Sequence, residues 1–297
     1  MTARPAITSS FRAVAVYGAK ETIKAFNANK TSWVGLAIFM AVVLMAILAP
    51  WLAPHDPLAF DTAKVLSPPS WSHMLGTDGI GRDVLSRMIY GARISLLVGF
   101  VSVGIAAVIG TALGSCAGYF GGWIDALIMR FVDIMLCFPT FFLILAVIAF
   151  LEPSIWNIMI IIGLTSWMYL ARIVRANFLS LKERDFIMAA HTIGTSNLSI
   201  IFKHILPNSI APIIVSGTLS VASAIINEAY ISFLGLGVQP PTATWGNMLE
   251  GAYNYIEAAP WLWIFPGSLI VLTVLSINFV GDGLRDALDP HALVNVE

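Results

Sequence analysis

The sequence predicts an all-α membrane protein with six transmembrane helices and a cytoplasmic coupling-helix loop between the fourth and the fifth. Two observations lead to this class. Of the 297 residues, 58% are hydrophobic and only 11% are charged, whereas an ordinary soluble domain carries roughly 25% charged residues. The mean hydropathy is +0.84, and the few charged residues separate six long uncharged stretches. A net charge of −1 also leaves no basic surface of the kind that binds nucleic acid.

Each predicted span is an uncharged stretch long enough to cross the hydrocarbon core of the bilayer, which takes about 20 residues of helix. The third and fourth stretches are separated only by Glu152 and Pro153, so we expect a tight turn there. A seventh uncharged run, 229–249, contains glycines and the Pro240-Pro241 pair, which favour a structured external loop after a last helical turn or two. The six expected spans are 33–52, 94–124, 134–151, 153–171, 204–227 and 258–281.

Lysine and arginine predict the orientation, because cytoplasmic loops carry an excess of both. Six spans place 12 of the 16 Lys and Arg residues on one side of the membrane, mainly before the first span and between the fourth and fifth. The other side has only Lys64, Arg82, Arg87 and Arg93. We therefore expect both termini to lie in the cytoplasm.

The N-terminal region is typical of a membrane anchor. Its apolar run of about 20 residues is longer than the roughly 7–15 of a signal peptide. Residues 9–29 can form an amphipathic helix at the membrane surface. The expected division of the chain is 1–30, a cytoplasmic amphipathic segment; 31–94, the first span and an extracytoplasmic loop; 95–290, the transmembrane domain with 172–208 as its long loop; and 291–297, a cytoplasmic tail.

Three glycines and two polar residues stand out within the spans. Gly110, Gly114 and Gly118 are four residues apart and share one helix face, where two backbones can approach closely. Packing within one bundle and packing at a subunit interface both remain open for them. Asn227 and Glu228 directly follow a long uncharged stretch. An ionisable group at membrane depth faces protein or a water-filled path, so a role in the translocation path and a structural hydrogen-bonding role both remain open.

The chain carries no recognisable catalytic or metal-binding motif. Neither a G-x-x-x-x-G-K-[ST] phosphate loop nor a G-x-S-x-G nucleophile motif occurs. The five histidines are scattered without an H-E-x-x-H pattern, which argues against a zinc site. Cys116 and Cys137 lie in apolar stretches, so we expect small buried side chains and no disulfide. We predict no catalytic residue, no metal and no cofactor on this chain.

The most informative segment is the loop 172–208, which is long for a connection within a compact bundle. Residues 179–193 are expected to form a helix that ends at Gly194 in the left-handed conformation. A second short helix should run from Thr195 or Ser196 to His204. Ala189, Ala190 and Gly194 gather small side chains at the turn, which leaves a shallow face for another protein; a plain amphipathic connector remains the alternative.

This loop resembles that of a known family. Met188-Ala189-Ala190, Gly194 and Leu206-Pro207 match the "EAA…G…LP" loop of ATP-binding-cassette (ABC) importer permeases, with Met188 in place of the motif's Glu and His204 where Ile is frequent. Residues 76–99, 231–249 and 281–290 resemble the dipeptide/oligopeptide/nickel group, and within it the second, C-type permease subunit.

The resemblance implies a permease that does not hydrolyse ATP itself, in the inner (plasma) membrane of a bacterial cell. It implies a homologous second permease, two ATPases that hold ATP and Mg, and an extracytoplasmic binding protein as partners, with membrane lipid around the helices and no nucleic acid. The residues implied to meet the ATPase and carry its motion into the helices are Asp185, Met188, Ala189, Ala190, Gly194, His204, Leu206 and Pro207.

Short peptides, di- and oligopeptides, are the expected cargo. Nickel, glutathione or another small solute remains an alternative for the same type of importer. A secondary carrier and an intramembrane enzyme are the competing classes. A carrier should show paired broken helices in two inverted halves, and this pattern is not evident in the sequence.

Overall fold

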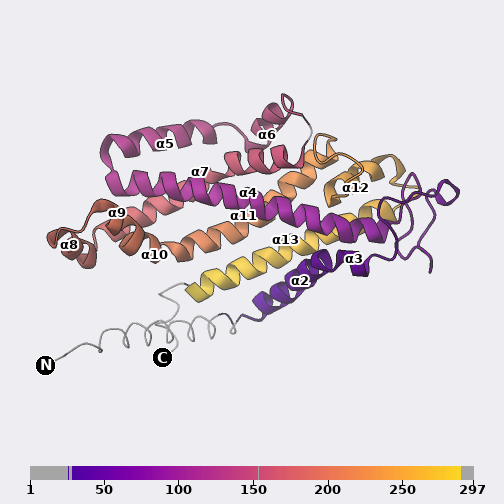
Figure 1. Cartoon of the computed structure of the whole chain (residues 1–297), viewed down its shortest axis with the longest axis horizontal. Helices are drawn as coiled ribbons and strands as arrows, with labels where there is room; N and C mark the ends of the chain where they lie inside the picture. Colours follow the sequence, from indigo (N-terminus) through magenta and orange to yellow (C-terminus); the bar gives the residue numbers. More distant parts are fainter. Residues whose placement is uncertain (1–25, 27–28, 153, 289–297) are drawn as a thin grey trace.

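The protein is described here from a computed structural model that covers residue 26 and residues 29–152 and 154–288. It is an elongated helical bundle in which α4, α7, α11, α13 and α2 run side by side along the long axis (Figure 1). The helices are α2 (Lys30–Ile47), α3 (Ala49–Leu52), α4 (Val84–Phe120), α5 (Gly122–Leu136), α6 (Thr140–Ile148), α7 (Ile155–Lys182), α8 (Asp185–Thr192), α9 (Asn197–Ile200), α10 (Leu206–Asn208), α11 (Ile210–Phe233), α12 (Trp245–Ala252) and α13 (Trp261–Leu288). Short 3₁₀ helices η1 (Thr62–Lys64) and η3 (Tyr253–Tyr255) and a π-helix η2 (Ile201–Ile205) complete them.

Within the described residues, five helices are long and apolar enough to cross a membrane: α2, α4, α7, α11 and α13. The expected third span, 134–151, is not one straight helix. It falls on α5 and α6, which meet at an 83° bend. Pro139 precedes α6 directly, and proline both lacks an N–H and disfavours helical geometry in the residue before it. With α5 and α6 counted as one broken span, the total is six.

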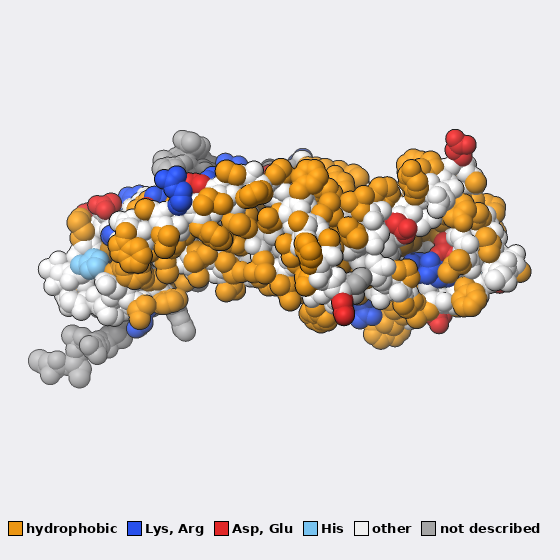
Figure 2. Space-filling view, turned by 90° about the horizontal axis from the view of Figure 1, so that it is seen from above, with side chains coloured by type: hydrophobic (Ala, Val, Ile, Leu, Met, Phe, Trp, Pro, Cys, Tyr) orange, Lys and Arg blue, Asp and Glu red, His pale blue; other side chains and the backbone are white. Residues whose placement is uncertain are grey.

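The distribution of side chains agrees with a membrane-spanning bundle. Hydrophobic side chains cover the middle of the face shown in Figure 2, and charged side chains gather toward its two ends. Large apolar side chains are exposed along the spans, among them Val108 at 71% and Val271 at 56%. Such side chains are favourable in lipid, where the surrounding solvent is as apolar as they are.

The most extensive contact between two helices in the described part of the chain joins α4 to α7, and it includes the predicted glycine face. A Cβ atom on Gly114 would lie 2.5 Å from the backbone oxygen of Ala171, and one on Gly118 would lie 2.6 Å from Cβ of Phe178. At Gly110 the corresponding distance to the backbone oxygen of Trp167 is 2.9 Å. Because these three glycines carry no side chain, the backbones of α4 and α7 can approach this closely.

Several expectations differ from the structure or lie outside the described residues. Cys116 and Cys137 are exposed rather than buried, so in the isolated chain they face its surroundings. The external loop expected over 229–249 contains the first turns of the helix α12. Thr244 and Asn247 form a capping box at the N-terminus of this helix. The turn expected at Glu152-Pro153 includes one residue, Pro153, outside the description. The amphipathic helix expected over 9–29 and the tail 291–297 also lie almost wholly outside it.

Candidate functional site

Residues 183–208 form a compact helical loop at one end of the bundle (Figure 1). The single helix expected over 179–193 is divided in two, because α7 ends at Lys182 and α8 begins at Asp185. Asp185 is exposed in the first turn of α8, where a carboxylate is favourable next to the helix N-terminus. Gly194 has φ +79°, the left-handed conformation that the sequence predicts, and Thr195 N donates to the oxygen of Ala190 at 3.1 Å to close the turn.

The second half of the helical loop leads into α11. His204 is half-buried in the π-helical turn, and Leu206 and Pro207 begin α10. Pro207 lacks the N–H that would bond to the oxygen of Lys203 in a regular α-helix, and the chain widens into a π-helix just before it. The segment therefore turns the chain from the loop into the bundle.

The helical loop has its own apolar core. Ile187, Ile200 and Ile205 are fully buried and pack with Phe178 of α7. Ala190 belongs to the same core and is only 6% exposed. Sequence reasoning placed Ala190 in a contact with a partner; the structure instead turns it inward, while its neighbour Ala189 is exposed.

Two hydrogen bonds connect this core to the end of α4. Tyr119 Oη donates to Asn197 Oδ1 at 2.8 Å, and Lys182 Nζ donates to the backbone oxygen of Tyr119 at 2.8 Å. The helical loop is thus fixed to both α4 and α7. A force on the loop would be transmitted to these two long helices.

The outward surface of the helical loop is apolar, and it carries no side chain at Gly194. A Cβ atom at Gly194 would meet no described residue within 4 Å, and Met188 is 51% exposed. An exposed apolar patch rimmed by polar residues is typical of a protein interaction site. Phe186 and Ile193 are further large apolar side chains exposed on the helical loop, whereas the exposed Leu198 and Phe202 line a groove against α4.

A second candidate surface is the polar face of α11. Ser216, Ser220, Ser223 and Asn227 recur at intervals of three or four residues and so share one side of the helix. Ser223 is exposed and the others are half-buried. The three serines line a groove of about 730 Å³ that α7 and α13 also border. Polar side chains in a membrane-spanning helix require protein or water in front of them.

Glu228 lies on a different face of α11 from Asn227. Its side chain is fully buried, Ser232 Oγ donates to Oε1 at 2.6 Å, and Ser95 Oγ of α4 lies 3.5 Å from Oε2. The backbone N of Trp245, at the start of α12, donates to Ser95 Oγ at 3.3 Å. The carboxyl group therefore connects α11 to α4 and, through Ser95, to α12. The two residues that the sequence singles out together have separate surroundings.

Ion pairs fasten α5 to α7. Arg175 contacts both carboxylate oxygens of Asp125, at 2.5 and 2.6 Å, and Arg172 lies 2.5 Å from Asp133 Oδ1. A guanidinium that engages both oxygens of a carboxylate is the stronger geometry. The first pair is also the better shielded of the two from solvent.

At the opposite end, the α3–α4 loop (residues 53–83) is tethered to α4 by histidines. His73 Nδ1 lies 2.9 Å from Asp83 Oδ1, and Asp83 Oδ2 accepts from the backbone N of Ser86 at 2.8 Å to cap α4. His55 stacks on His73 with ring centroids 4.6 Å apart. The nitrogens and carboxylate of this trio lie within 4.8 Å of one another, close enough to share a cation. Both oxygens of Asp83 are already engaged, and the trio holds the loop on the helix.

Three kinds of comparison relate this chain to known proteins. Residues 110–294 match the family model described as "Binding-protein-dependent transport system inner membrane component", and residues 19–69 match the N-terminal TM domain of oligopeptide transport permease C. The dipeptide transport system permease protein DppC of Alkalihalophilus pseudofirmus is 48% identical, over 91% of this chain and 89% of the relative. The di/tripeptide transport system permease protein DppC of Pseudomonas aeruginosa is 46% identical over 91% of each chain.

A solved structure has a similar fold. A chain from an inward-facing conformation of the MetNI methionine ABC transporter matches with a TM-score of 0.55 and 20% identity. The match covers 68% of this chain and 96% of that one. At this identity the likeness concerns the arrangement of helices alone.

Proposed function

The chain belongs to the inner membrane components of binding-protein-dependent transport systems and is the permease of a di/oligopeptide ABC importer; from this premise we propose that its helical loop receives the motion of a cytoplasmic ATPase. An importer of this type works with an ATPase and a binding protein, and the permease itself is not catalytic.

The proposal for the helical loop is carried by one observation: its exposed apolar surface stands on a core fixed to α4 and α7. The ATPase holds ATP and Mg and closes on them, and the loop moves with it. Because Asn197 connects the loop to Tyr119 of α4, and Lys182 at the end of α7 bonds to the same residue, the motion reaches the long helices as a rigid-body shift. Such a shift converts an inward-facing bundle into an outward-facing one.

The polar face of α11 supports a second permease as partner. Ser216, Ser220 and Ser223 line a groove, where Ser223 is exposed and Ser220 Oγ donates to the backbone oxygen of Ser216. An exposed polar side chain such as Ser223 is unfavourable against lipid. A homologous subunit, with its own ATPase, would enclose this face and complete a path between the two permeases. Hydroxyl and amide groups along the path, Asn227 among them, can replace water around the backbone of a passing peptide. Glu228 then stabilises the contact between the helices beside the path and does not contact the cargo.

The orientation follows from the same assignment. A helical loop that meets a cytoplasmic ATPase places α8 and α9 in the cytoplasm and both termini with them. The α3–α4 loop and α12, at the other end of the bundle (Figure 1), then face the binding protein outside the inner membrane of a bacterial cell. The excess of Lys and Arg on the side of the helical loop supports this orientation.

Reconstitution tests the function as a whole. The complex of this chain with its partner permease and ATPases is placed in proteoliposomes, and uptake of a labelled dipeptide is measured. Uptake should require both ATP and the binding protein. Uptake that proceeds without ATP, driven by an ion gradient, would instead support a secondary carrier.

A further inference from the structure

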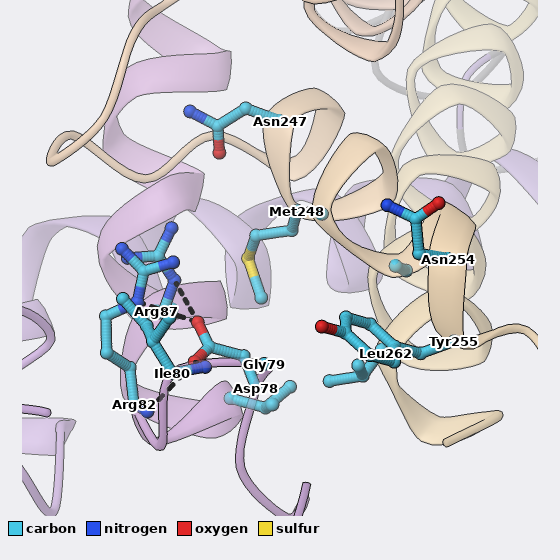
Figure 3. Close-up of a pocket in the computed structure, with 13 residues that line it drawn as sticks. Asp78, Gly79, Ile80, Arg82, Arg87, Asn247, Met248, Asn254, Tyr255 and Leu262 are labelled. Carbon is cyan, nitrogen blue, oxygen red and sulfur yellow. Dashed lines mark hydrogen bonds and ion pairs between the residues drawn. The ribbon is translucent and has the colours of Figure 1, made fainter. Parts of the chain in front are cut away.

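A pocket of about 260 Å³ opens at the end of the bundle opposite the helical loop. One wall is the chain from Asp78 to Arg87, which leads into α4, and the other is formed by α12, η3 and the start of α13. Figure 3 shows Arg82 and Arg87 beside Asp78 on one side, with Asn254 and Tyr255 across from them. The pocket thus lies between two segments far apart in the sequence.

The positive charge of the pocket is only partly neutralised. Asp78 is the one carboxylate among the lining residues, and it faces two guanidinium groups. Its Oδ2 accepts from Arg82 Nε at 2.7 Å, whereas Arg87 Nε remains 3.7 Å away. A single carboxylate cannot fully balance both cations, and Arg82 has the shorter contact.

Arg87 is the residue left without a full partner. It is 3% exposed, and its Nη1 is buried with no hydrogen-bond partner among the described residues. A buried cation without a complete countercharge is unfavourable unless something else supplies the charge. The neighbouring acid Glu250 is exposed and does not line the pocket.

The remaining lining suits one residue of a peptide or protein. Met248 and Leu262 provide apolar walls, while the exposed Asn254 amide and the Tyr255 hydroxyl provide polar groups. Asn247 is not available, because its amide nitrogen already donates to the oxygens of Val238 and Thr242. A guanidinium group matches the planar carboxylate in shape as well as in charge.

We propose that this pocket binds a carboxylate group that arrives from outside, as the countercharge of Arg87. The proposal rests on the proposed function in one respect, namely that this end of the bundle faces the binding protein. Two sources share the chemistry: the terminal carboxylate of a delivered peptide, and an acidic side chain of the binding protein. The test separates them.

Gly251 gives direct access to the pocket without disturbing it. It lines the pocket on α12, and a Cβ atom there would meet no atom of the described part of the chain within 4 Å. In a chain with serine at Cys116 and Cys137, Gly251→Cys is labelled with anionic sulfonatoethyl or cationic trimethylammonioethyl methanethiosulfonate. The measured quantity is the ratio of the anionic to the cationic labelling rate. This ratio should be roughly tenfold higher at Gly251→Cys than at Ala59→Cys, an exposed control position on the α3–α4 loop. Equal ratios at the two positions would overturn the proposal.

Charge reversal in the complex then identifies the source. Gly251→Asp adds a negative charge to the pocket wall, and Gly251→Asn is the matched neutral control. If the binding protein supplies the carboxylate, Gly251→Asp weakens its docking to the nanodisc-embedded complex roughly tenfold and Gly251→Asn does not. If the peptide supplies it, docking is unchanged, and a free dipeptide protects Gly251→Cys from labelling while its C-terminal amide does not.

Identical docking and uptake for Gly251→Asp and Gly251→Asn, together with no protection of Gly251→Cys by a free dipeptide, would also overturn the proposal. The labelling measurement needs only the purified chain and no transport. An anion preference at Gly251→Cys in a complex that takes up no peptide would therefore reject the proposed function and retain the pocket. Normal peptide uptake by a complex in which Gly251→Cys shows no anion preference would retain the proposed function and reject the pocket.

Discussion

Tyr119, in the last turns of α4, donates a hydrogen bond of 2.8 Å to Asn197 in α9. These two residues are 78 positions apart, and the bond joins the helical loop to the longest helix of the bundle. If the loop carries motion from the ATPase, this bond is part of the linkage. Its loss should affect the efficiency of transport more than the assembly of the complex.

We expect Tyr119→Phe to keep the ATPase bound but to raise the number of ATP molecules hydrolysed per peptide transported. The substitution removes one hydrogen bond, worth about 1 kcal/mol, and leaves the aromatic ring in place. Asn197→Asp is the control, because a carboxylate retains the acceptor for Tyr119 and should transport as the unaltered chain does. An unchanged ratio of ATP to peptide in Tyr119→Phe would exclude this bond from the coupling route.

Glu228 and Asn227 should give opposite results although they are adjacent. Glu228→Ala leaves a cavity and removes the acceptor of Ser232, which should lower the stability of the solubilised chain by about 2–4 kcal/mol. Glu228→Gln retains an acceptor oxygen and should be much milder. The measurement is the midpoint of thermal unfolding in detergent.

At Asn227 the effect should appear in transport instead. Its side chain is half-buried on the polar face of α11, so Asn227→Ala should preserve the unfolding midpoint and lower peptide uptake by the complex. Reduced uptake in a stable Glu228→Gln chain, with normal uptake in Asn227→Ala, would exchange the roles of the two residues.

The contact between α4 and α7 predicts a large difference between two glycines of the same helix. Gly114→Ala places a Cβ atom 2.5 Å from the oxygen of Ala171, whereas the Cβ atom of Gly104→Ala meets none of the residues that the structure describes within 4 Å. The first should cost about 1–3 kcal/mol through overpacking, and the second should be neutral or slightly stabilising. Thermal unfolding of the two purified variants measures the difference, and equal stabilities would contradict the close packing.

Topology is tested by single cysteines in a chain lacking Cys116 and Cys137. Cysteines at Asp61 and Thr242 should react in intact cells with a thiol reagent that cannot cross the inner membrane. Cysteines at Ser9 and Ala292 should react only after the membrane is opened. Labelling of position 292 in intact cells would reject the model with both termini in the cytoplasm.

The positions of the long helices are predictable from the sequence, because the thickness of the bilayer demands long uncharged runs. Other features depend on packing that no local pattern reveals. The bend between α5 and α6 could be suspected from Pro139, but proline alone does not say how sharply a span bends. His55 and His73 meet on Asp83 because the α3–α4 loop folds back on α4, and the 17 residues between the two histidines conceal this in the sequence.

Adjacent residues show the same limit at the candidate sites. Met188-Ala189-Ala190 identifies the segment, but only the fold shows that Ala190 faces the core of the loop and Ala189 its surroundings. Polar side chains occur on more than one face of α11, so the sequence pattern alone could not separate Asn227 from Glu228. The buried, incompletely paired Arg87 was missed altogether, since its charge in the sequence resembles that of any basic loop residue.

The claim that the helical loop docks on the ATPase is tested most directly by co-purification with Ala189→Glu. Ala189 is exposed, so the chain should reach the membrane with an unchanged unfolding midpoint. The buried charge in the contact should nonetheless weaken ATPase binding by several kcal/mol and abolish uptake. Ala189→Ser is the matched control, and Ala190→Glu should instead destabilise the loop itself because Ala190 is buried. ATPase binding and uptake by Ala189→Glu at the level of Ala189→Ser would contradict the account.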